Sequence, residues 1–295
     1  MITDISIIIV SWNTRDLLKE CLQSIYEHTR GVSFEIFVID NASTDGTVEM
    51  LKSLQSIHLY RTLTLISNPA NRGFASANNQ GIAQTEGKYV LLLNPDTRLR
   101  ENTLSAMTAH MDKNPRCGIL GCHLSNSDGS HQDSVRRFPL LLDQSLILLK
   151  LHHIFLNTAP INRYLCKDFN YIQPQSVDQV MGACFMIRKE VINVIGTLDE
   201  NFFNWFEEVD FCKRTKNAGY TICYTPEATV IHHHGASFKQ VMTLKKQMMW
   251  NSSLRYYFKK HNKKVAYIAI SIVSLVSLVI TYLLSIFKFE TSSKS

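Results

Sequence analysis

Three short polar clusters stand where apolar, β-branched runs of the sequence end. They are Ser11-Trp12-Asn13, Asp40-Asn41 and Asn94-Pro95-Asp96. Each cluster alone is an ordinary turn sequence. The carboxyl ends of parallel strands, however, meet at one edge of an open sheet, and ligands bind in the crevice beyond that edge. We therefore expect the three clusters to face one crevice.

The residue types in these clusters favour a nucleotide held through a divalent cation. No GxGxxG pattern follows the first apolar run, which disfavours a dinucleotide site, and Gly87-Lys88-Tyr89 is not a phosphate-binding loop of the P-loop type. Mg²⁺ and Mn²⁺ prefer oxygen ligands and bridge phosphate oxygens. A mononucleotide bound by carboxylates and Mg²⁺ or Mn²⁺ is the remaining natural choice.

A second acidic cluster, Glu207-Glu208-Val209-Asp210, lies among aromatic residues. On a solvated helix it would be an ordinary acidic face. Its neighbours Phe202, Phe203, Trp205 and Phe206 instead predict partial burial. Burial raises the pKa of a carboxyl group, and such a group can act as a general base.

A run of three histidines, His232-His233-His234, precedes Gly235. In an extended segment consecutive side chains alternate between two sides, so at most two of the three can point into one site. The run is either a surface feature, or one histidine completes a metal shell or contacts a diphosphate.

The elements that must position these residues alternate between strand and helix. Strands are predicted at 5–10, 34–39, 63–66 and 89–93, with helical patterns between them. This is a βαβ series, and it predicts a mostly parallel α/β sheet with right-handed crossovers. After about residue 115 the alternation stops, although 117–124 and 180–187 also have the pattern of strands. The segment 140–156 is rich in Leu and Ile, which predicts a helix packed on the sheet. The alternative is an amphipathic surface that touches a membrane or a lipid-linked substrate.

Composition limits the class of protein. The chain has 295 residues, 45% of them apolar and 19% charged, which excludes global disorder. The net charge of +6 is mild and mostly unclustered, which argues against nucleic-acid binding. The seven cysteines form no CxxC pair, and a reducing compartment is the simplest interpretation. The amino terminus lacks the basic region of a signal peptide, so we expect the catalytic part in the cytosol.

The carboxyl-terminal region has a different composition. Residues 265–287 contain no charged side chain, and a helix of that length reaches about 34 Å, enough to cross a bilayer core. The alternatives are a buried core helix or a helix lying on the membrane. Lysines at 259, 260, 263 and 264 favour a single-pass helix with the preceding residues on the cytoplasmic side. The expected division is a catalytic domain at 1–240, a basic juxtamembrane segment at 241–264, a transmembrane helix at 265–287 and a short tail at 288–295.

Taken in order, the motifs resemble those of family 2 glycosyltransferases. The resemblance covers about residues 5–240 and implies a GT-A fold and an inverting transferase that uses a nucleotide-sugar. It is carried by Val10-Ser11-Trp12-Asn13, Ile39-Asp40-Asn41-Ala42-Ser43, Asn71-Arg72-Gly73-Phe74-Ala75, Asn94-Pro95-Asp96-Thr97, Gly182-Ala183-Cys184, Gly196-Thr197-Leu198-Asp199, Glu207-Glu208-Val209-Asp210 and the segment 232–237.

On the donor side, the resemblance implies that Asp40 binds the nucleoside base, with Ser11, Trp12 and Asn13 beside it. Asn94-Pro95-Asp96 occupies the position of the family's DxD motif. Its first carboxylate is replaced by Asn94, which can still reach the ribose or a phosphate. Asp96 is then the expected metal ligand at this position.

His232 matches the histidine that meets the metal or the diphosphate. Glu208 stands where the family's catalytic base is usually Asp, and Glu207 is its rival for that role. The implied cofactor is Mg²⁺ or Mn²⁺.

The pattern is most similar to bacterial rhamnosyltransferases of surface-polysaccharide synthesis. It implies transfer of a sugar, L-rhamnose, from a dTDP- or UDP-sugar to a lipid-linked glycan at the cell inner membrane. Galactofuranosyl and N-acetylhexosaminyl transferases share much of the pattern. The alternative from a different functional class is a non-catalytic scaffold that only binds nucleotide-sugar. It is favoured by Asn94, which replaces the first carboxylate of the DxD motif, and by Glu208, which stands where the base is usually Asp.

Overall fold

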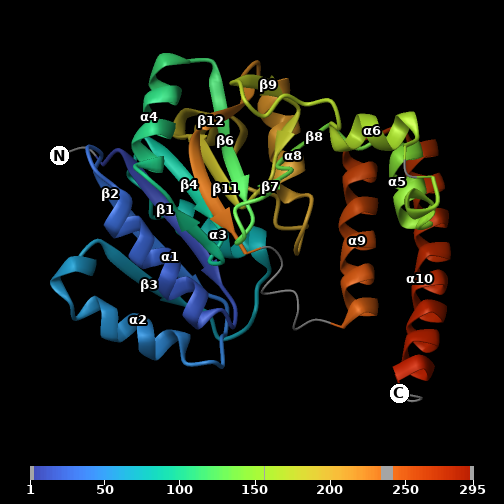
Figure 1. The fold of residues 1–295 in the computed structure, drawn as a ribbon, viewed down its shortest axis with the longest axis horizontal. Helices are drawn as coiled ribbons and strands as arrows, with labels where there is room; N and C mark the ends of the chain where they lie inside the picture. The colour runs from blue at the N-terminus through green and yellow to red at the C-terminus, as the bar shows by residue number, and fades with distance from the viewer. Residues whose placement is uncertain (1–2, 156, 234–241, 293–295) are drawn as a thin grey trace.

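The computed structural model describes residues 3–155, 157–233 and 242–292, and a mostly parallel sheet lies at its centre (Figure 1). Eight strands form the main path of this sheet. In spatial order they are β3 (Leu63–Ser67), β2 (Phe34–Asp40), β1 (Ile5–Ser11), β4 (Tyr89–Leu93), β11 (Cys184–Arg188), β6 (Cys117–Ser125), β12 (Thr221–His232) and β5 (Thr97–Leu99). Off this path, β7 (His131–Gln132) pairs with β6 and β9 (Gln175–Val177) pairs with β12, while β8 (Val135–Arg136) and β10 (Gln179–Val180) form a separate pair.

The first four βα units make the parallel half of the sheet. β1 pairs in parallel with β2 on one side and with β4 on the other, and β2 pairs in parallel with β3. The register places Ser11 opposite Asp40, so the first two polar clusters lie side by side at the carboxyl ends of these strands. β11 then runs antiparallel to both β4 and β6.

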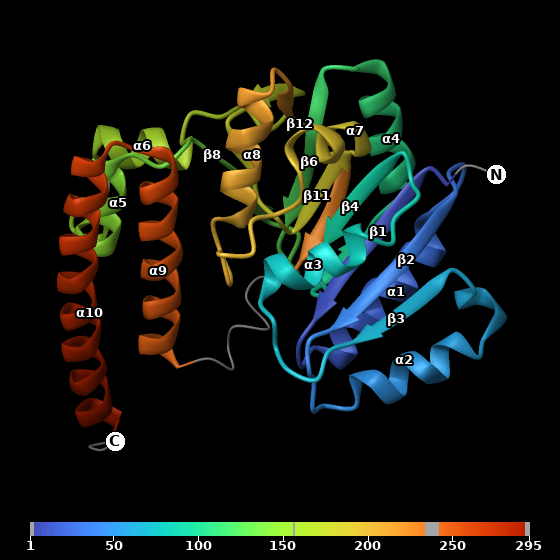
Figure 2. The same cartoon turned by 180° about the vertical axis from the view of Figure 1, so that it is seen from behind.

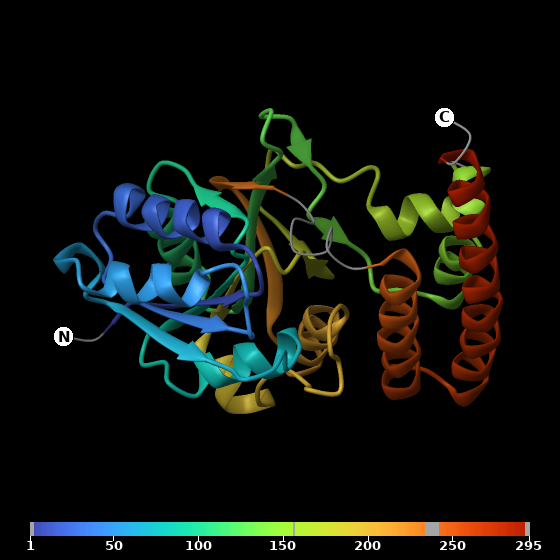
Figure 3. The ribbon, with the colours of Figure 1, turned by 90° about the horizontal axis from the view of Figure 1, so that it is seen from below.

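Helices cover both faces of the sheet, as Figures 2 and 3 show from behind and from below. The alternating side chains of β1 explain the two layers, because Ile7 and Ile9 belong to one buried cluster and Ile8 and Val10 to another. The first cluster includes α1 (Arg15–His28), α2 (Thr47–Gln55) and α4 (Thr103–Lys113). The second includes α3 (Phe74–Ile82), α7 (Lys189–Ile195) and α8 (Glu207–Asn217).

The helix α3 approaches β1 closely because it carries a glycine at the contact. A Cβ atom on Gly81 would lie 2.7 Å from Ile8 Cγ2, closer than side chains pack. The small residues of α3 therefore let it lie directly on the sheet, which fixes the loop that precedes it.

A third buried cluster joins the catalytic part to a helical region at one side of the molecule. It brings Phe202, Phe206 and Val209 together with residues of the later helices. These helices are α5 (Leu141–Leu148), α9 (Thr243–His261) and α10 (Lys264–Ser292). The short helices η1 (His58–Tyr60), η2 (Leu151–His153) and α6 (Ala159–Leu165) complete the set in the described residues.

The predicted fold class is confirmed, as are the strands predicted at 5–10, 34–39, 63–66, 89–93 and 117–124, to within a residue at each end. The strand predicted at 180–187 is divided, because Met181, Gly182 and Ala183 separate β10 from β11. The prediction that 140–156 packs on the sheet is wrong. Its helix α5 packs chiefly against α10 and α6 instead, because its leucines have the apolar α10 as a partner.

The helix α10 is the one described helix that is long and apolar enough to cross a membrane. Within the segment Lys264–Ser285, the most apolar stretch of 18 residues has a mean hydropathy of 2.4, and 22% of that stretch is buried within the protein. The segment predicted as a basic juxtamembrane region at 241–264 holds α9, whose side chains Leu254, Tyr257 and Phe258 are fully buried.

Candidate active site

One cleft of about 760 Å³ opens at the carboxyl ends of the parallel strands. It is lined on one side by the ends of β1, β4 and β12, and on the other by the start of α8 and by α9. Six of the predicted site residues line it: Trp12, Asn94, Asp96, Glu207, Glu208 and His232. The sheet-end cluster and the acidic cluster, which are more than one hundred residues apart in sequence, therefore face the same space.

Asp96 and His232 form a buried pair at the sheet side of the cleft. Asp96 Oδ1 lies 3.4 Å from His232 Nε2, and both side chains are almost fully buried. On its other side the ring places Nδ1 2.7 Å from Gln132 Oε1, and Asn94 Nδ2 lies 3.4 Å from Nε2. Gln132 Nε2 donates to Asn126 Oδ1, so Gln132 Oε1 faces the ring and accepts from Nδ1, and Nε2 is the ring atom that faces Asp96.

This arrangement fits a divalent cation. A histidine that binds a metal through one nitrogen usually donates the other N–H to an oxygen, as His232 does to Gln132. Mg²⁺ and Mn²⁺ need few protein ligands when phosphate oxygens and water supply the rest. Among the residues that the structure describes, no group of three His, Cys, Asp or Glu side chains is placed to hold a metal, so Asp96 and His232 would have to share the ion with a ligand. His234 lies outside the described residues.

Asp40 lies at the end of β2 and is 2% exposed. Its Oδ2 accepts a hydrogen bond from the backbone N–H of Ser43 at 3.1 Å. Its Oδ1 is buried and has no hydrogen-bond partner among the described residues. A buried acceptor without a donor is costly. Asp40 itself does not line the cleft, whereas its neighbour Asn41 does.

The next residue, Asn41, reaches the cleft itself and organises the loop before α3. Its Oδ1 accepts from the Asn68 side chain and from the Arg72 backbone, both at 3.1 Å. Its Nδ2 donates to Asn71 Oδ1 at 3.1 Å and to the Gly73 carbonyl at 3.3 Å. The expectation that Asn41 faces the crevice is met, since it lines the cleft, whereas its hydrogen bonds to the loop before α3 follow from the fold.

Ser11 and Asn13 are near the cleft but do not line it. Ser11 is fully buried, with its Oγ 2.9 Å from Thr14 Oγ1. Asn13 has a positive φ of 51°, and its Oδ1 accepts from the Thr44 backbone at 2.7 Å. The Ser11 side chain therefore holds the turn after β1 together, and Asn13 ties that turn to the one after β2, while Trp12 between them faces the cleft.

Glu207 and Glu208 open α8 at the opposite side of the cleft. The Oε2 atom of each is buried without a described hydrogen-bond partner. Burial raises the pKa of Glu208, and burial together with the neighbouring Glu208 charge raises the pKa of Glu207 well above its usual range. Glu207 therefore takes up a proton first. Glu208, which is also the less buried of the two, remains the candidate base.

The backbone before α8 is strained in a way that aims these carboxylates. Trp205 and Phe206 have positive φ values of 65° and 69°, which non-glycine residues seldom adopt. Phe206 is held there by edge contacts with Trp250 of α9 and by the Tyr257 ring. Asp210, the third carboxylate of the cluster, faces α9 rather than the cleft, and so has no part in the chemistry of the cleft.

The cleft also contains residues that the sequence analysis did not single out. Arg136 is the last residue of the short strand β8, and Lys245 and Trp250 lie on α9. They come from segments without a recognisable motif, and only the fold brings them to the site. Together they add two cations and an indole ring to the wall of the cleft.

The two sides of the cleft touch at Gly73. The backbone N–H of Phe74 donates to the Phe203 carbonyl at 2.8 Å, and a Cβ on Gly73 would lie 2.5 Å from that oxygen. Gly73 also has a φ of +82°, which a side chain would strain. The loop before α3 and the loop before α8 can meet at this point only because residue 73 is glycine.

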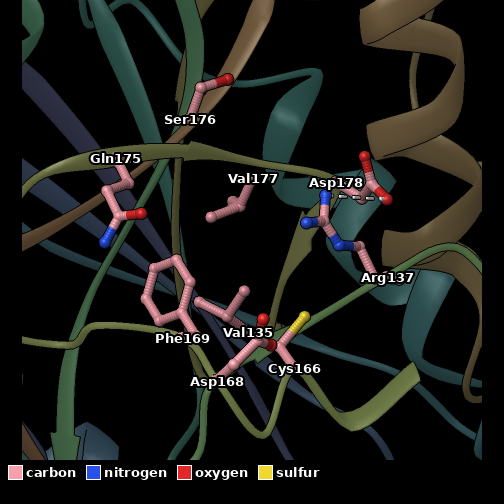
Figure 4. Close-up of a pocket in the computed structure, with 9 residues that line it drawn as sticks. All are labelled: Val135, Arg137, Cys166, Asp168, Phe169, Gln175, Ser176, Val177 and Asp178. Carbon is pink, nitrogen blue, oxygen red and sulfur yellow. Dashed lines mark ion pairs between the residues drawn. The ribbon is translucent and has the colours of Figure 1, made fainter. Parts of the chain in front are cut away.

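A second, smaller cavity of about 130 Å³ lies away from this cleft, between β8, β9 and the turn after α6 (Figure 4). Arg137 Nη1 and Asp178 Oδ2 lie 3.9 Å apart at one side of this cavity. None of the predicted site residues lines this cavity, so the larger cleft is the candidate active site.

Comparison with known proteins identifies the family. The model of glycosyl transferase family 2 matches residues 6–196. The chain is 28% identical over 216 residues to the N-acetylglucosaminyl-diphospho-decaprenol L-rhamnosyltransferase of Mycobacterium tuberculosis, covering 68% of this chain and 67% of that protein. It is 26% identical to the rhamnosyltransferase WbbL of Escherichia coli, covering 86% of this chain and 92% of WbbL.

Solved structures agree on the fold. The mannosyltransferase PcManGT of Pyrobaculum calidifontis, in complex with GDP-Man and Mn²⁺, superposes with a TM-score of 0.58 at 17% identity, covering 95% of this chain and 74% of that one. GalNAc-T7 with UDP, GalNAc and Mn²⁺ superposes with a TM-score of 0.59 at 15% identity, covering 87% of this chain and 48% of GalNAc-T7. The fold is therefore GT-A, as the resemblance implied. With the family model matching most of the sheet and the donor side of its cleft, the chain belongs to glycosyl transferase family 2 and is a glycosyltransferase.

Proposed function

We propose that this glycosyltransferase transfers L-rhamnose, with inversion, from a nucleotide-sugar to a lipid-linked or growing cell-surface glycan. The observation that carries the proposal is the single cleft shared by the Asp96–His232 pair and the Glu207–Glu208 carboxylates. Inversion requires a leaving group on one side of the sugar and a base on the other, and these two groups stand on different walls of the cleft. The names of the two rhamnosyltransferase relatives support the choice of sugar.

On the donor side, Asp40 would accept a hydrogen bond from the base of a dTDP- or UDP-sugar through its unpartnered Oδ1. Asn94 stands beside the pair and would contact the ribose or a phosphate. Asp96 and His232 would hold Mg²⁺ or Mn²⁺, with Gln132 fixing the imidazole. When bound, the cation neutralises the charge that develops on the departing nucleoside diphosphate.

On the acceptor side, Glu208 would remove the proton from the attacking hydroxyl group. Glu207 would stay protonated beside it, because burial and the Glu208 charge raise its pKa. The hydroxyl oxygen then forms its bond to the anomeric carbon as the bond to the diphosphate breaks. This route needs no covalent intermediate between sugar and protein.

The place of action that we propose is the inner membrane, with the catalytic domain on the cytoplasmic face. The apolar helix α10 supports membrane attachment. The name of the mycobacterial relative includes an acceptor carried on a diphospho-decaprenol, which supports a lipid-linked acceptor here.

A donor screen tests the proposal. The purified protein is incubated with dTDP-rhamnose, UDP-galactofuranose or UDP-N-acetylglucosamine, with a lipid-linked acceptor, and with Mn²⁺ or EDTA. We expect release of nucleoside diphosphate from dTDP-rhamnose only when both acceptor and metal are present.

Two other results would redirect the proposal. Turnover of another donor would keep the mechanism and change the sugar, which makes the protein a galactofuranosyl or N-acetylhexosaminyl transferase. Tight nucleotide-sugar binding without turnover of any donor would identify a non-catalytic scaffold.

A further inference from the structure

The helix α10 has two opposite faces. A stripe at helical spacing is buried: Ile270, Ser274, Ser277 and Thr281. The other face exposes large apolar side chains, each between 45 and 78% accessible, at Val265, Ile268, Ile272, Leu275, Val276, Val279, Tyr282, Leu283 and Leu284. We call this second set the outer face of α10. An exposed apolar surface of this length on a soluble protein marks a binding surface.

The buried stripe packs against α9, which runs antiparallel to α10 beside its first two-thirds. Asn251 Nδ2, in the middle of α9, donates to the Ser274 carbonyl in α10 at 2.9 Å. The turn between the two helices lies at residues 262–263. Figures 1 and 2 show α10 at the edge of the molecule, with α9 between it and the sheet.

The helix α9 is in turn fixed to the catalytic domain. Lys260 Nζ lies 2.6 Å from Asp199 Oδ2 and 2.8 Å from Asp210 Oδ1, and Ser253 Oγ donates to the Asn204 carbonyl at 2.8 Å. At its other end, α9 lines the cleft. Its position is therefore tied to the active site at several points along its length.

This packing is incompatible with a crossing by α10 along the membrane normal. If α10 crossed while packed on α9, then α9 would lie at the same depth in the bilayer. Its Lys246 and Arg255 would then enter the hydrocarbon core, which is costly for charged side chains. Because α9 lines the cleft, the cleft would also be drawn into the bilayer. A crossing would require α10 to leave α9 and expose its buried stripe of hydroxyl groups to lipid.

We infer that α10 lies in the plane of the membrane surface, with its outer face buried in the lipid and α9 above it. The partner is an anionic phospholipid bilayer. Charge complementarity supports this choice, because Lys259, Lys263 and Lys264 are exposed at the turn between the helices. The helix α5 beside α10 adds one more exposed apolar side chain, Leu142.

The inference differs from the single crossing expected from sequence in one measurable respect, the side of the membrane on which α10 ends. Ser292→Cys, at the last residue of α10, is expressed in the full chain, and inverted inner-membrane vesicles are treated with a membrane-impermeant maleimide. We expect labelling without detergent, at a rate comparable to that of the control Lys113→Cys on the exposed surface of α4. Labelling of Ser292→Cys only after detergent, with Lys113→Cys labelled throughout, would show a crossing and overturn the inference. The wild type gives the background from the native cysteines.

A second experiment tests the surface itself. Full-length Ile272→Glu/Val276→Glu is mixed with vesicles containing phosphatidylglycerol, and binding is measured by flotation. We expect binding to fall about tenfold or more, whereas Val194→Glu, at an exposed apolar position on α7, should leave it unchanged. If the double variant binds these vesicles as well as the wild type does, the inference is overturned. Sedimentation showing that the outer face instead joins two copies of the chain would also overturn it. Neither experiment needs the donor, so a failed rhamnosyl transfer would not be mistaken for a failed membrane contact.

Discussion

His261, the last residue of α9, places its Nε2 atom 2.6 Å from Asp210 Oδ1, two residues after the candidate base Glu208. Asp210 is fully buried and also accepts from Arg214 Nε and Lys260 Nζ, both at 2.8 Å. Burial alone would raise the pKa of Asp210, but its hydrogen bonds with His261, Lys260 and Arg214 hold it below its usual range. The helix that carries the base is thus fixed to α9 through one buried carboxylate.

Asp210→Ala should destabilise the protein by about 1.5–3 kcal/mol, because the partly buried Arg214 and Lys260 lose the carboxylate that they share. Asp16→Ala, which breaks a solvent-exposed pair with Arg15, should produce no measurable change. Urea unfolding of the detergent-solubilised proteins provides the comparison. Equal midpoints for wild type and Asp210→Ala would mean that α9 is not held through this carboxylate.

Asp199 should make the stability depend on pH at the acid end. Although burial raises its pKa, hydrogen bonds from Lys260 and Asn201 lower it to about 2. A lowered folded-state pKa contributes stability above the unfolded value of about 4, and that stability is lost as the pH falls toward 2. We expect the advantage of wild type over Asp199→Asn to be on the order of 1 kcal/mol at pH 6 and to shrink below pH 4. Urea unfolding at pH 6 and pH 3 measures it, and a constant difference would contradict the assignment.

Asp96→Ala should remove metal-dependent turnover and leave the fold intact, because Asp96 is the one carboxylate at the sheet side of the cleft that faces His232. Gln132→Leu should raise the Mn²⁺ concentration needed for half-maximal activity by about 10–100-fold, since it frees the imidazole that Gln132 orients. Circular dichroism checks the fold, and Asp128→Ala on the adjacent exposed turn is the matched control. Near-normal activity of Asp96→Ala would show that the metal assignment is wrong.

Glu208→Gln should lower kcat by roughly 10²–10⁴-fold while nucleotide-sugar affinity barely changes, because the amide cannot accept a proton. In the wild type, activity should fall as the pH drops through the raised pKa of Glu208, since the base works only when ionised. Glu207→Gln should be milder, because burial and the neighbouring Glu208 charge raise the pKa of Glu207 and favour its protonated form, which the amide resembles. The reverse order of severity would place the base at Glu207.

Asp40→Ala should weaken nucleotide binding by about 1–3 kcal/mol by removing the acceptor for the base. Isothermal titration with dTDP and with UDP measures the loss, and Ser43→Ala, which keeps the Asp40 carboxylate, is the control. If both variants bind nucleotide like the wild type, the base lies elsewhere.

The donor side of the cleft could be predicted from sequence because its residues follow strands. Asp40 and Asp96 stand next to continuous apolar runs, and a parallel sheet has only one edge where such ends can meet. The acceptor side was harder to predict. Asp210 lies two residues after Glu208, yet Asp210 faces α9 while Glu208 faces the cleft. Only the helical geometry of α8 separates their roles.

The placement of α9 could not be predicted from its composition. Its polar and basic residues suggested a juxtamembrane segment, whereas Tyr257 and Phe258 are fully buried against the catalytic domain. Ionic contacts such as that of Lys260 with Asp199 depend on residues about sixty positions apart. Local periodicity carries no information about such pairs.

The contact at Gly73 has a thermodynamic consequence for substrate binding. The loops before α3 and α8 meet there through the hydrogen bond from Phe74 to Phe203, with no side chain between them to absorb movement. A ligand that shifts the first loop must also displace the second, so the affinities for donor and acceptor are linked. Such linkage is reciprocal. If bound donor changes the affinity for the acceptor by some factor, bound acceptor changes the affinity for the donor by the same factor. We therefore expect the two substrates to bind cooperatively, and Gly73→Ala to reduce that cooperativity more than it reduces either affinity alone.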